Sequence, residues 1–284
     1  MKKYSFLIES KSNFDLNYLN NLSNIRDRIK YCDNSLEYIG HGVGKRVYKL
    51  DDTSVLKLAY NRKGLDQNKT EILISKYDYP FLAKVYNCEK RGKWIVAEYC
   101  YLNCDRDYGS TFQDFKNKIK QITRLDTVNL WFLCHVLVSG GIQYYNKSKD
   151  LFKKMCYELQ DQNSIPFKKF KERSHSFWWD LLRNYYKVDN DMELCKNVGE
   201  LHIAVSYAFH RGMKPSPKFN LDYCFKIIDS GKYKSIPFIK DLIRYPDVRN
   251  KIDLADCFNT ANTGIVKRNG KDEIVILDYG WREK

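Results

Sequence analysis

The spacing of the apolar positions changes after residue 31 of the chain. Before that point, from residue 14 onward, apolar residues recur three or four positions apart, at Leu16, Leu19, Leu22, Ile25 and Ile29. This spacing places them on one face of a helix. The pattern therefore predicts an N-terminal helix that buries that face against another part of the protein.

Residues 36–100 carry short apolar runs separated by Gly, Asp and Asn, which is typical of strands. Between the apolar runs at residues 54–59 and 94–99, Ile72 and Lys76 continue a helical face. The segment is therefore predicted to form two strands, a helix and two further strands. Its clearest elements are the strands Val47–Lys49, Ser54–Ala59 and Trp94–Tyr99 and the helix Asn68–Lys76.

Residues 105–250 return to helical spacing, and residues 263–278 return to strands. The predicted helices are Val128–Leu137, Leu151–Leu159, Phe177–Tyr186 and Leu194–Phe209. Near residue 270, two β-branched runs flank Asn269-Gly270, and Asn-Gly in that setting is a strong hairpin signal. The order of elements predicts an α+β protein with a small antiparallel β lobe, a helical lobe and a hairpin after them.

The length and composition of the chain fit two lobes. With 284 residues and 43% hydrophobic residues, the chain can bury more than one small core. No run of about 18 uncharged apolar residues occurs, so no membrane-spanning helix is expected, and the apolar run near Met1 is too short for a signal peptide. The nine cysteines form no Cys-x-x-Cys pair, which favours free thiols. These features indicate a cytoplasmic protein.

The net charge of +14 attracts phosphate groups, whether on a nucleotide, a nucleic acid or a membrane surface. A dispersed, solvated lysine-rich surface explains the same charge, and we favour it. The densest basic cluster, residues 168–173, is short and contains Glu172. Nucleic-acid binding is therefore only an alternative interpretation of the charge.

Residues 39–71 combine three features that suit phosphate binding. Gly40, Gly42 and Gly44 lack side chains, so backbone N–H groups can approach phosphate oxygens closely, although glycine-rich turns are common. Lys57 lies in an otherwise apolar strand, where its ammonium must meet an anion or extend to water. Glu71 follows on a predicted helix, and an ion pair with Lys57 would hold that lysine against nucleotide phosphates.

The order of these residues resembles the small lobe of protein kinases. The resemblance covers Gly40-x-Gly42-x-x-x-x-Val47, Lys57, Glu71 and Trp94–Tyr99, and it implies that Lys57 and Glu71 are the paired lysine and glutamate of that lobe. Ala97 would be the gatekeeper, while Lys45 stands where kinases usually have a third glycine. The implied nucleotide-binding residues are Gly40, Gly42, Val47, Lys57, Glu98 and Cys100.

A second part of the resemblance lies at residues 262–280. Asn262, the Asn-Gly hairpin and Asp278-Tyr279-Gly280 resemble the catalytic-loop Asn, the two following strands and the Asp-Phe-Gly motif of kinases. An amide oxygen and a carboxylate are ligands of the kind that Mg²⁺ prefers. The resemblance thus implies metal ligands at Asn262 and Asp278, with ATP and Mg²⁺ bound. Taken alone, residues 278–280 would be an ordinary turn after a strand.

The position of the catalytic aspartate departs from the kinase pattern. Kinases place this residue five positions before the Asn, where this chain has Cys257. A thiol cannot replace a carboxylate that accepts the proton of the substrate hydroxyl. The neighbouring Asp256 is the candidate base, with Asp253 as a more distant one. The other interpretation is a pseudokinase that binds ATP without efficient transfer.

A competing alignment exists at residues 210–231. His210-Arg211-Gly212 and the residues up to Pro217 are similar to the kinase catalytic loop, and Asp229 would then be the metal ligand. This alignment lacks both the catalytic Asp and the metal-binding Asn. We interpret the segment instead as a helix that ends at Gly212, followed by a turn with prolines.

The sequence therefore predicts a bilobal protein-kinase-like fold. Residues 1–35 would be an N-terminal helical extension, residues 36–100 the N-lobe, and residues 101–284 a helical C-lobe with the catalytic and metal-site hairpin at 253–280. Some segments, residues 67–71 and 80–86, are similar to kinase-like proteins of tailed bacteriophages and some bacteria.

The expected function is ATP–Mg²⁺-dependent phosphoryl transfer, with catalytic residues Lys57, Glu71 and Asp256. The acceptor would be Ser or Thr of a protein, a host protein if the chain is encoded by a phage. A small-molecule acceptor and a nucleotide-binding regulatory module are the alternatives.

Overall fold

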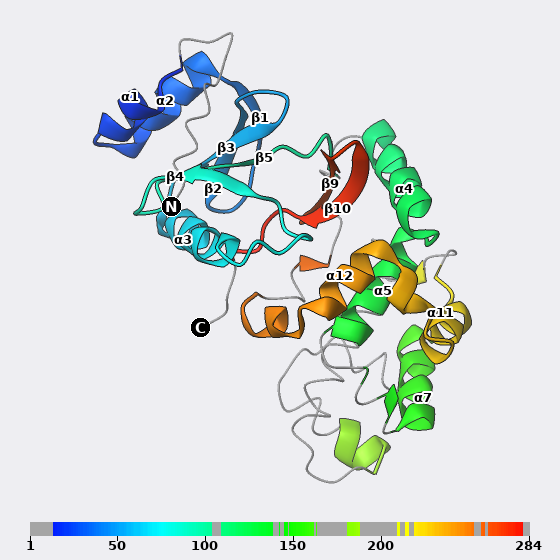
Figure 1. Cartoon of the computed structure of the whole chain (residues 1–284). Helices are drawn as coiled ribbons and strands as arrows, with labels where there is room; N and C mark the ends of the chain where they lie inside the picture. The colour runs from blue at the N-terminus through cyan, green and yellow to red at the C-terminus, as the bar shows by residue number, and fades with distance from the viewer. Residues whose placement is uncertain are drawn as a thin grey trace. The chain divides into compact units, whose positions relative to one another are not determined.

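The computed structural model describes residues 14–103, 109–138, 142, 145–146, 148–161, 163, 181–187, 209–210, 214–215, 219–252, 257–258 and 261–280. The chain divides into two compact units, of which unit 1 contains Met1–Leu102 and Gly264–Lys284 and unit 2 contains Asn103–Thr263 (Figure 1). The hairpin of residues 264–280 belongs to unit 1, although the sequence assigned it to the helical part.

Unit 1 begins with two helices where the sequence predicts one. Helix α1 spans Leu16–Asn21 and helix α2 spans Ile25–Ser35. The side chain of Asn24 accepts a hydrogen bond of 2.9 Å from the amide of Asp27, which starts a new helix at this point. Both helices pack on the sheet, so they form a layer of unit 1 rather than an extension of it. The hydrophobic cluster that the helices and the sheet bury between them consists of Leu19, Cys32, Tyr48, Leu50, Leu56, Leu58, Trp94 and Val96.

The core of unit 1 is a five-stranded antiparallel sheet in the order β1-β2-β3-β5-β4. Strand β3, in the middle, is buried along its whole length, as its apolar sequence predicts. The strands are β1 Glu37–His41, β2 Lys45–Lys49, β3 Ser54–Ala59, β4 Val85–Cys88 and β5 Trp94–Glu98. The mixed α and β character and the antiparallel sheet expected from the sequence are therefore present.

Helix α3, Arg62–Ser75, and the hairpin of β9 and β10 complete unit 1. The helix starts six residues before the predicted one because Asn61 caps it, its side chain accepting a bond from the amide of Gly64. Strands β9, Thr263–Arg268, and β10, Lys271–Ile276, flank Asn269 and Gly270, whose φ angles are 50° and 76°. Positive φ at both positions is what an Asn-Gly hairpin turn requires, so this prediction is confirmed. Strand β6, Leu102–Asn103, pairs beside β9.

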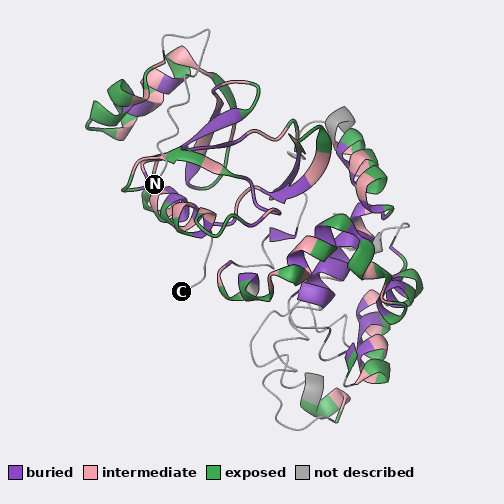
Figure 2. Cartoon of the chain, in the orientation of Figure 1, coloured by how far each residue is buried: buried purple, intermediate pink, exposed green. Residues whose placement is uncertain are grey.

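Unit 2 is mainly helical in the part that the structure describes. Helix α5 is buried on almost every side (Figure 2), and it agrees with the predicted helix Val128–Leu137, as α7 does with Leu151–Leu159. The helices are α4 Gly109–Thr123, α5 Thr127–Val138, α7 Lys149–Gln160, α11 Leu221–Asp229 and α12 Pro237–Arg244, with a π-helix at Leu181–Tyr185 and 3-10 turns at Lys232–Ser235 and Pro246–Asn250.

Two further helix predictions for unit 2 fall largely outside the described residues. Of Phe177–Tyr186, residues 181–186 are described, and Leu181–Tyr185 form the π-helix. Of Leu194–Phe209, only Phe209 is described. It begins strand β7, Phe209–His210, which pairs with β8, Lys214–Pro215, so the predicted helix does not include Phe209. The interpretation of a helix end at Gly212 falls on a residue outside the described part of the chain.

Candidate functional site

Lys57 points toward helix α3 because the side chains along strand β3 alternate between the two faces of the sheet. Successive side chains of a strand point to opposite faces, and the neighbours Leu56 and Leu58 belong to the cluster under α1 and α2. Lys57 therefore faces the other side of the sheet. There its ammonium donates to Oε2 of Glu71 at 2.7 Å and to the carbonyl oxygen of Leu277 at 2.6 Å. The expected ion pair between Lys57 and Glu71 is present.

Glu71 is held in place by the attachment of α3 to the sheet. One turn before it, the buried side-chain amide of Asn68 donates to the carbonyl oxygens of Lys57 and Gly92. Gly92 has a φ of 79°, and a side chain there would lie 2.6 Å from the carbonyl oxygen of Leu65. Helix α3 thus lies directly on the turn between β4 and β5, which fixes the height of Glu71 above the sheet.

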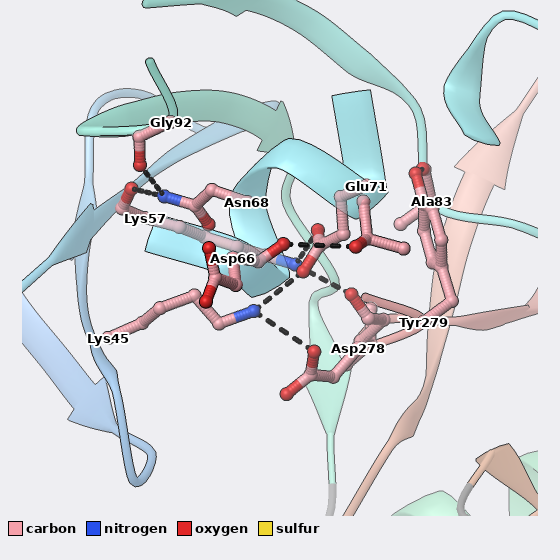
Figure 3. A network of polar contacts seen from close by, with 11 residues as sticks. Lys45, Lys57, Asp66, Asn68, Glu71, Ala83, Gly92, Asp278 and Tyr279 are labelled. Carbon is pink, nitrogen blue, oxygen red and sulfur yellow. Dashed lines mark hydrogen bonds and ion pairs between the residues drawn. The ribbon is translucent and has the colours of Figure 1, made fainter. Parts of the chain in front are cut away.

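A second lysine, which the sequence analysis did not include among the site residues, reaches the same glutamate. On strand β2, Val47 lies directly opposite Lys57, and Lys45, two residues before Val47, lies opposite Ala59. Lys45 is therefore on the same face of the sheet as Lys57. Its ammonium donates to Oε1 of Glu71 at 2.6 Å and to Oδ1 of Asp278 at 3.0 Å (Figure 3). The residue that replaces a glycine in the kinase pattern is therefore a member of the site.

Asp278, Tyr279 and Gly280 each have a specific environment. Asp278 contacts Lys45, and Tyr279 is buried and donates to the carbonyl oxygen of Ala83 at 2.9 Å. At Gly280, a side chain would lie 2.3 Å from the carbonyl oxygen of Gln67, so the backbone rests directly on α3. An ordinary surface turn would not need three such positions in a row. This segment joins the end of β10 to the helix that carries Glu71.

Lys45, Lys57, Glu71 and Asp278 form a cluster without net charge. Of these four side chains, that of Asp278 is the most exposed to solvent. The exposed fractions of the side chains are 0% for Glu71, 6% for Lys45, 10% for Lys57 and 35% for Asp278. Burial opposes the charge on Lys45, but the carboxylates of Glu71 and Asp278 outweigh it and raise the pKa of this ammonium. Burial likewise favours the neutral form of Asp278, yet Lys45 and Lys57 lower its pKa to about 2. The lysine and the carboxylate are thus both charged at neutral pH.

The glycine-rich turn between β1 and β2 is anchored to the start of α3. A side chain at Gly44 would lie 2.5 Å from the amide nitrogen of Gly64, and the carbonyl oxygen of Gly44 accepts a bond from the amide of Tyr60. The side-chain amide of Asn61 donates to the carbonyl oxygen of Val43 at 2.9 Å. At Gly42, by contrast, an added side chain would meet open space. Gly40 lies within β1, beside a bulge and opposite Val47.

Two of the expected nucleotide-binding residues, Glu98 and Cys100, lie at the end of β5 and just after it. The carboxylate of Glu98 accepts from Nε of Arg268 at 2.9 Å and from the amide of Lys84 at 3.1 Å, so its side chain joins β5 to β9. Cys100 packs against Gly264, where a side chain would lie 2.7 Å from Sγ, and burial raises the pKa of its thiol. The Arg268–Glu98 pair has no counterpart among the sequence predictions.

Of the candidate base and the second expected metal ligand, the structure describes only the latter, Asn262. Asp253 and Asp256 lie outside the described residues. Cys257, at the kinase position of the catalytic aspartate, is buried in unit 2. Asn262 is half-buried and is assigned to unit 2, whereas Asp278 is assigned to unit 1.

The competing alignment places Asp229 in a different environment. Asp229 is the last residue of α11, and its carboxylate accepts from the hydroxyl of Tyr145 at 2.6 Å and pairs with Lys149 and Lys153 at 2.7 and 3.4 Å. Burial by itself favours the neutral form, but these donors lower the pKa of Asp229 to about 2. The contacts tie α7 to α11 within unit 2, which is a structural role for this carboxylate.

Among the four charged residues of the cluster, Asp278 is the partly exposed carboxylate that could bind a metal ion. It is ionised, partly exposed and already in contact with a cation. No group of three or more His, Cys, Asp or Glu side chains in the described part of the chain forms a metal site by itself. Mg²⁺ usually binds through one or two carboxylates together with phosphate oxygens and water. The cluster therefore fits a magnesium ion that arrives with a phosphate ligand.

Comparison with known proteins gives no relative for this chain: no family model, no curated protein and no solved structure matches it. Within the described part of the chain, every helix is too short or too polar to span a lipid bilayer. The functional interpretation therefore depends on the geometry of the cluster and on the resemblance of the sequence motifs.

Proposed function

We propose that the chain is a kinase-like phosphotransferase that binds ATP with Mg²⁺ at the cluster of Lys45, Lys57, Glu71 and Asp278. One observation carries the proposal: a carboxylate of α3 and a carboxylate after β10 meet two ammonium groups of the sheet. Lysines held by acidic residues beside an ionised, partly exposed Asp are a suitable arrangement for a triphosphate and a divalent cation.

Each residue has a role that follows from its contacts. Glu71, which is fully buried, orients the ammonium groups of Lys45 and Lys57. The ammonium groups would neutralise phosphate charge, and Asp278 would hold Mg²⁺. Magnesium, when bound, draws charge from the phosphate oxygens.

In the transfer step, the oxygen of an acceptor hydroxyl bonds to the γ-phosphorus, and the bond between that phosphorus and the bridging oxygen breaks to leave ADP. The hydroxyl proton passes to a base, for which Asp256 is our candidate. We propose Ser or Thr of a host protein as the acceptor, because residues 67–71 and 80–86 are similar to phage kinase-like proteins. A small molecule with a hydroxyl group is the other acceptor class.

Nucleotide binding and phosphoryl transfer test this proposal in one protein sample. Isothermal titration with ATP and Mg²⁺ is expected to show saturable binding, which Asp278→Asn weakens strongly because the metal loses its carboxylate. Asp272→Asn is the matched control, since it removes a carboxylate from the same hairpin at a site that contacts Tyr101 instead. Absence of ATP binding by the unmodified protein would overturn the proposal.

A second candidate function is supported by the buried thiol of Cys257. A pseudokinase that binds nucleotide and acts as a regulatory module would not need a carboxylate at that position. Transfer of labelled γ-phosphate to a set of Ser- and Thr-containing peptides, or to the protein itself, separates the two functions. ATP binding without transfer, unchanged by Asp256→Ala, would support the pseudokinase.

A further inference from the structure

The two lysines of the cluster have different kinds of partner. Lys57 donates to a main-chain carbonyl, that of Leu277, and to Glu71, which is fully buried. Both partners are fixed by the packing of β10 and α3. Because leaving this partly buried carbonyl without a donor would cost free energy, the contact of Lys57 is favoured while unit 1 is folded.

Lys45 has one fixed partner and one partner that a ligand would engage. It shares Glu71 with Lys57, and its other contact is the partly exposed carboxylate of Asp278. If Asp278 held a divalent cation, a phosphate group bound to that cation would offer its oxygens to Lys45, whose ammonium is 3.0 Å from the same carboxylate. Lys45 is also the first residue of β2, directly after the glycine-rich turn.

We propose that Lys45 is the lysine that binds the phosphates of the nucleotide, and that Lys57 is a positioning residue that ties β3, α3 and the Asp278 segment together. The inference depends on the proposed function, since it assigns the phosphate contact within that nucleotide site. It reverses the assignment that the sequence resemblance implies, in which Lys57 holds the phosphates.

This division of roles agrees with the geometry around each ammonium. An ammonium has three N–H donors. Two of those of Lys57 are directed at oxygens that cannot move apart without shifting β10 from α3. Two of those of Lys45 are directed at carboxylates, and Asp278 can exchange its ammonium partner for a metal ion while Lys45 turns to a phosphate oxygen.

The decisive experiment compares ligands that differ only in their phosphates. Binding of ATP with Mg²⁺ and of adenosine is measured by titration for the unmodified protein, Lys45→Met and Lys57→Met. We expect Lys45→Met to weaken ATP at least about tenfold and to leave adenosine unchanged, because a charge-assisted bond to phosphate is lost. Lys57→Met is expected to lower the melting temperature markedly while keeping most of the preference for ATP over adenosine.

Controls separate the inference from the proposed function. Lys69→Met removes a lysine from the exposed side of α3 and is expected to change neither ligand. If Lys57→Met does not fold, Lys57→Arg takes its place, and the Lys45→Met result alone still decides. A protein that does not bind ATP at all contradicts the proposed function. A protein that binds ATP, and whose preference for ATP survives Lys45→Met, overturns the assignment to Lys45.

Discussion

Helices α3 and α5 each lie within the core of their unit, but they bury opposite kinds of side chain. Helix α5 is buried at every position except Val128 and is almost wholly apolar. Helix α3 buries Gln67, Asn68 and Glu71 beside Gly64 and Ile74. An apolar side chain needs only neighbours of the right shape, whereas a buried polar group needs a partner at a defined distance and angle.

The comparison teaches where chemistry is to be expected in this molecule. Glu71 and Asn68 are fully buried, and the structure supplies them with lysine ammonium and main-chain partners. Directional contacts of this kind fix the position of α3 more narrowly than packing does. Unit 1 thus holds its charged groups in register, while α5 of unit 2 depends mainly on apolar packing, with a few polar contacts such as the 3.0 Å bond that Asn129 accepts from the amide of Asn220.

The largest expected effect is the loss of packing around α5. Phe132 is fully buried and makes edge-to-face contacts with Phe219 and Phe225. Phe132→Ala is expected to destabilise unit 2 by about 3 to 5 kcal/mol, because it leaves a cavity. Hydrogen exchange of α5 and of α3, measured in parallel, checks this. Leu73→Ala, at an exposed position of α3, is the control. If Phe132→Ala lowered the protection of α3 as much as that of α5, the expectation that the effect is confined to unit 2 would be wrong.

The next effect concerns the charges that α3 buries. Glu71→Gln keeps the shape of the side chain but leaves the ammonium groups of Lys45 and Lys57 without their shared carboxylate. We expect a loss of about 3 kcal/mol in unit 1, since breaking a buried ion pair leaves uncompensated charge. Chemical denaturation followed through hydrogen exchange of β3 measures it. A change below about 1 kcal/mol would mean that the cluster is solvated.

Acid pH should distinguish the units through His135, the ionisable side chain that α5 buries together with Cys134. Burial lowers the pKa of His135 to about 3, against an ordinary value of 6.5, although a bond with the backbone of Phe258 opposes the shift. The unfolded chain therefore binds a proton between pH 6.5 and 3 that the folded chain does not, and stability falls as pH falls through this window. The expected loss is roughly 2 kcal/mol at pH 5.

Melting of the protein between pH 7 and pH 5 measures the effect of His135. His135→Leu removes the titrating group, and its melting temperature should depend less on pH over this range. An equally steep pH dependence in the variant would assign the acid sensitivity to another group.

The smallest effect compares one helix cap from each unit. Asn61 caps α3 and Asn220 caps α11, each accepting a bond from an amide three residues later at 2.9 Å. Replacing either by Ala should cost about 1 kcal/mol. Only Asn61→Ala also releases the carbonyl oxygen of Val43, so it alone should raise hydrogen exchange in the glycine-rich turn. Equal exchange there in both variants would show that the turn does not depend on α3.

The sequence predicted those features whose signal is local. The alternation of β3 placed Lys57 on the face away from Leu56 and Leu58, and Asn269-Gly270 determined the hairpin through positive φ angles. The start of α3 was misplaced because the cap at Asn61 was not considered. Lys45 was treated as a missing glycine, although its distance of two residues from Val47 puts it on the same face as Lys57.

Other features had no local signal. Arg268 and Glu98 are 170 positions apart, and nothing near either residue indicates the partner. The two-helix start of the chain depends on the cap at Asn24, which apolar spacing alone does not detect. The role of Asp256 stays a prediction, since this residue is outside the described part of the chain.

The contact between Lys45 and Asp278 spans 233 positions of sequence. During synthesis from the N-terminus, the sheet and α3 leave the ribosome with two ammonium groups facing one carboxylate, and the intervening helical unit emerges before the second carboxylate does. The cluster of Lys45, Lys57, Glu71 and Asp278 can therefore reach electrical balance only after the hairpin of residues 264–280 has been made and rests on α3. The order of synthesis thus makes completion of the charged site a late step in the assembly of this unit.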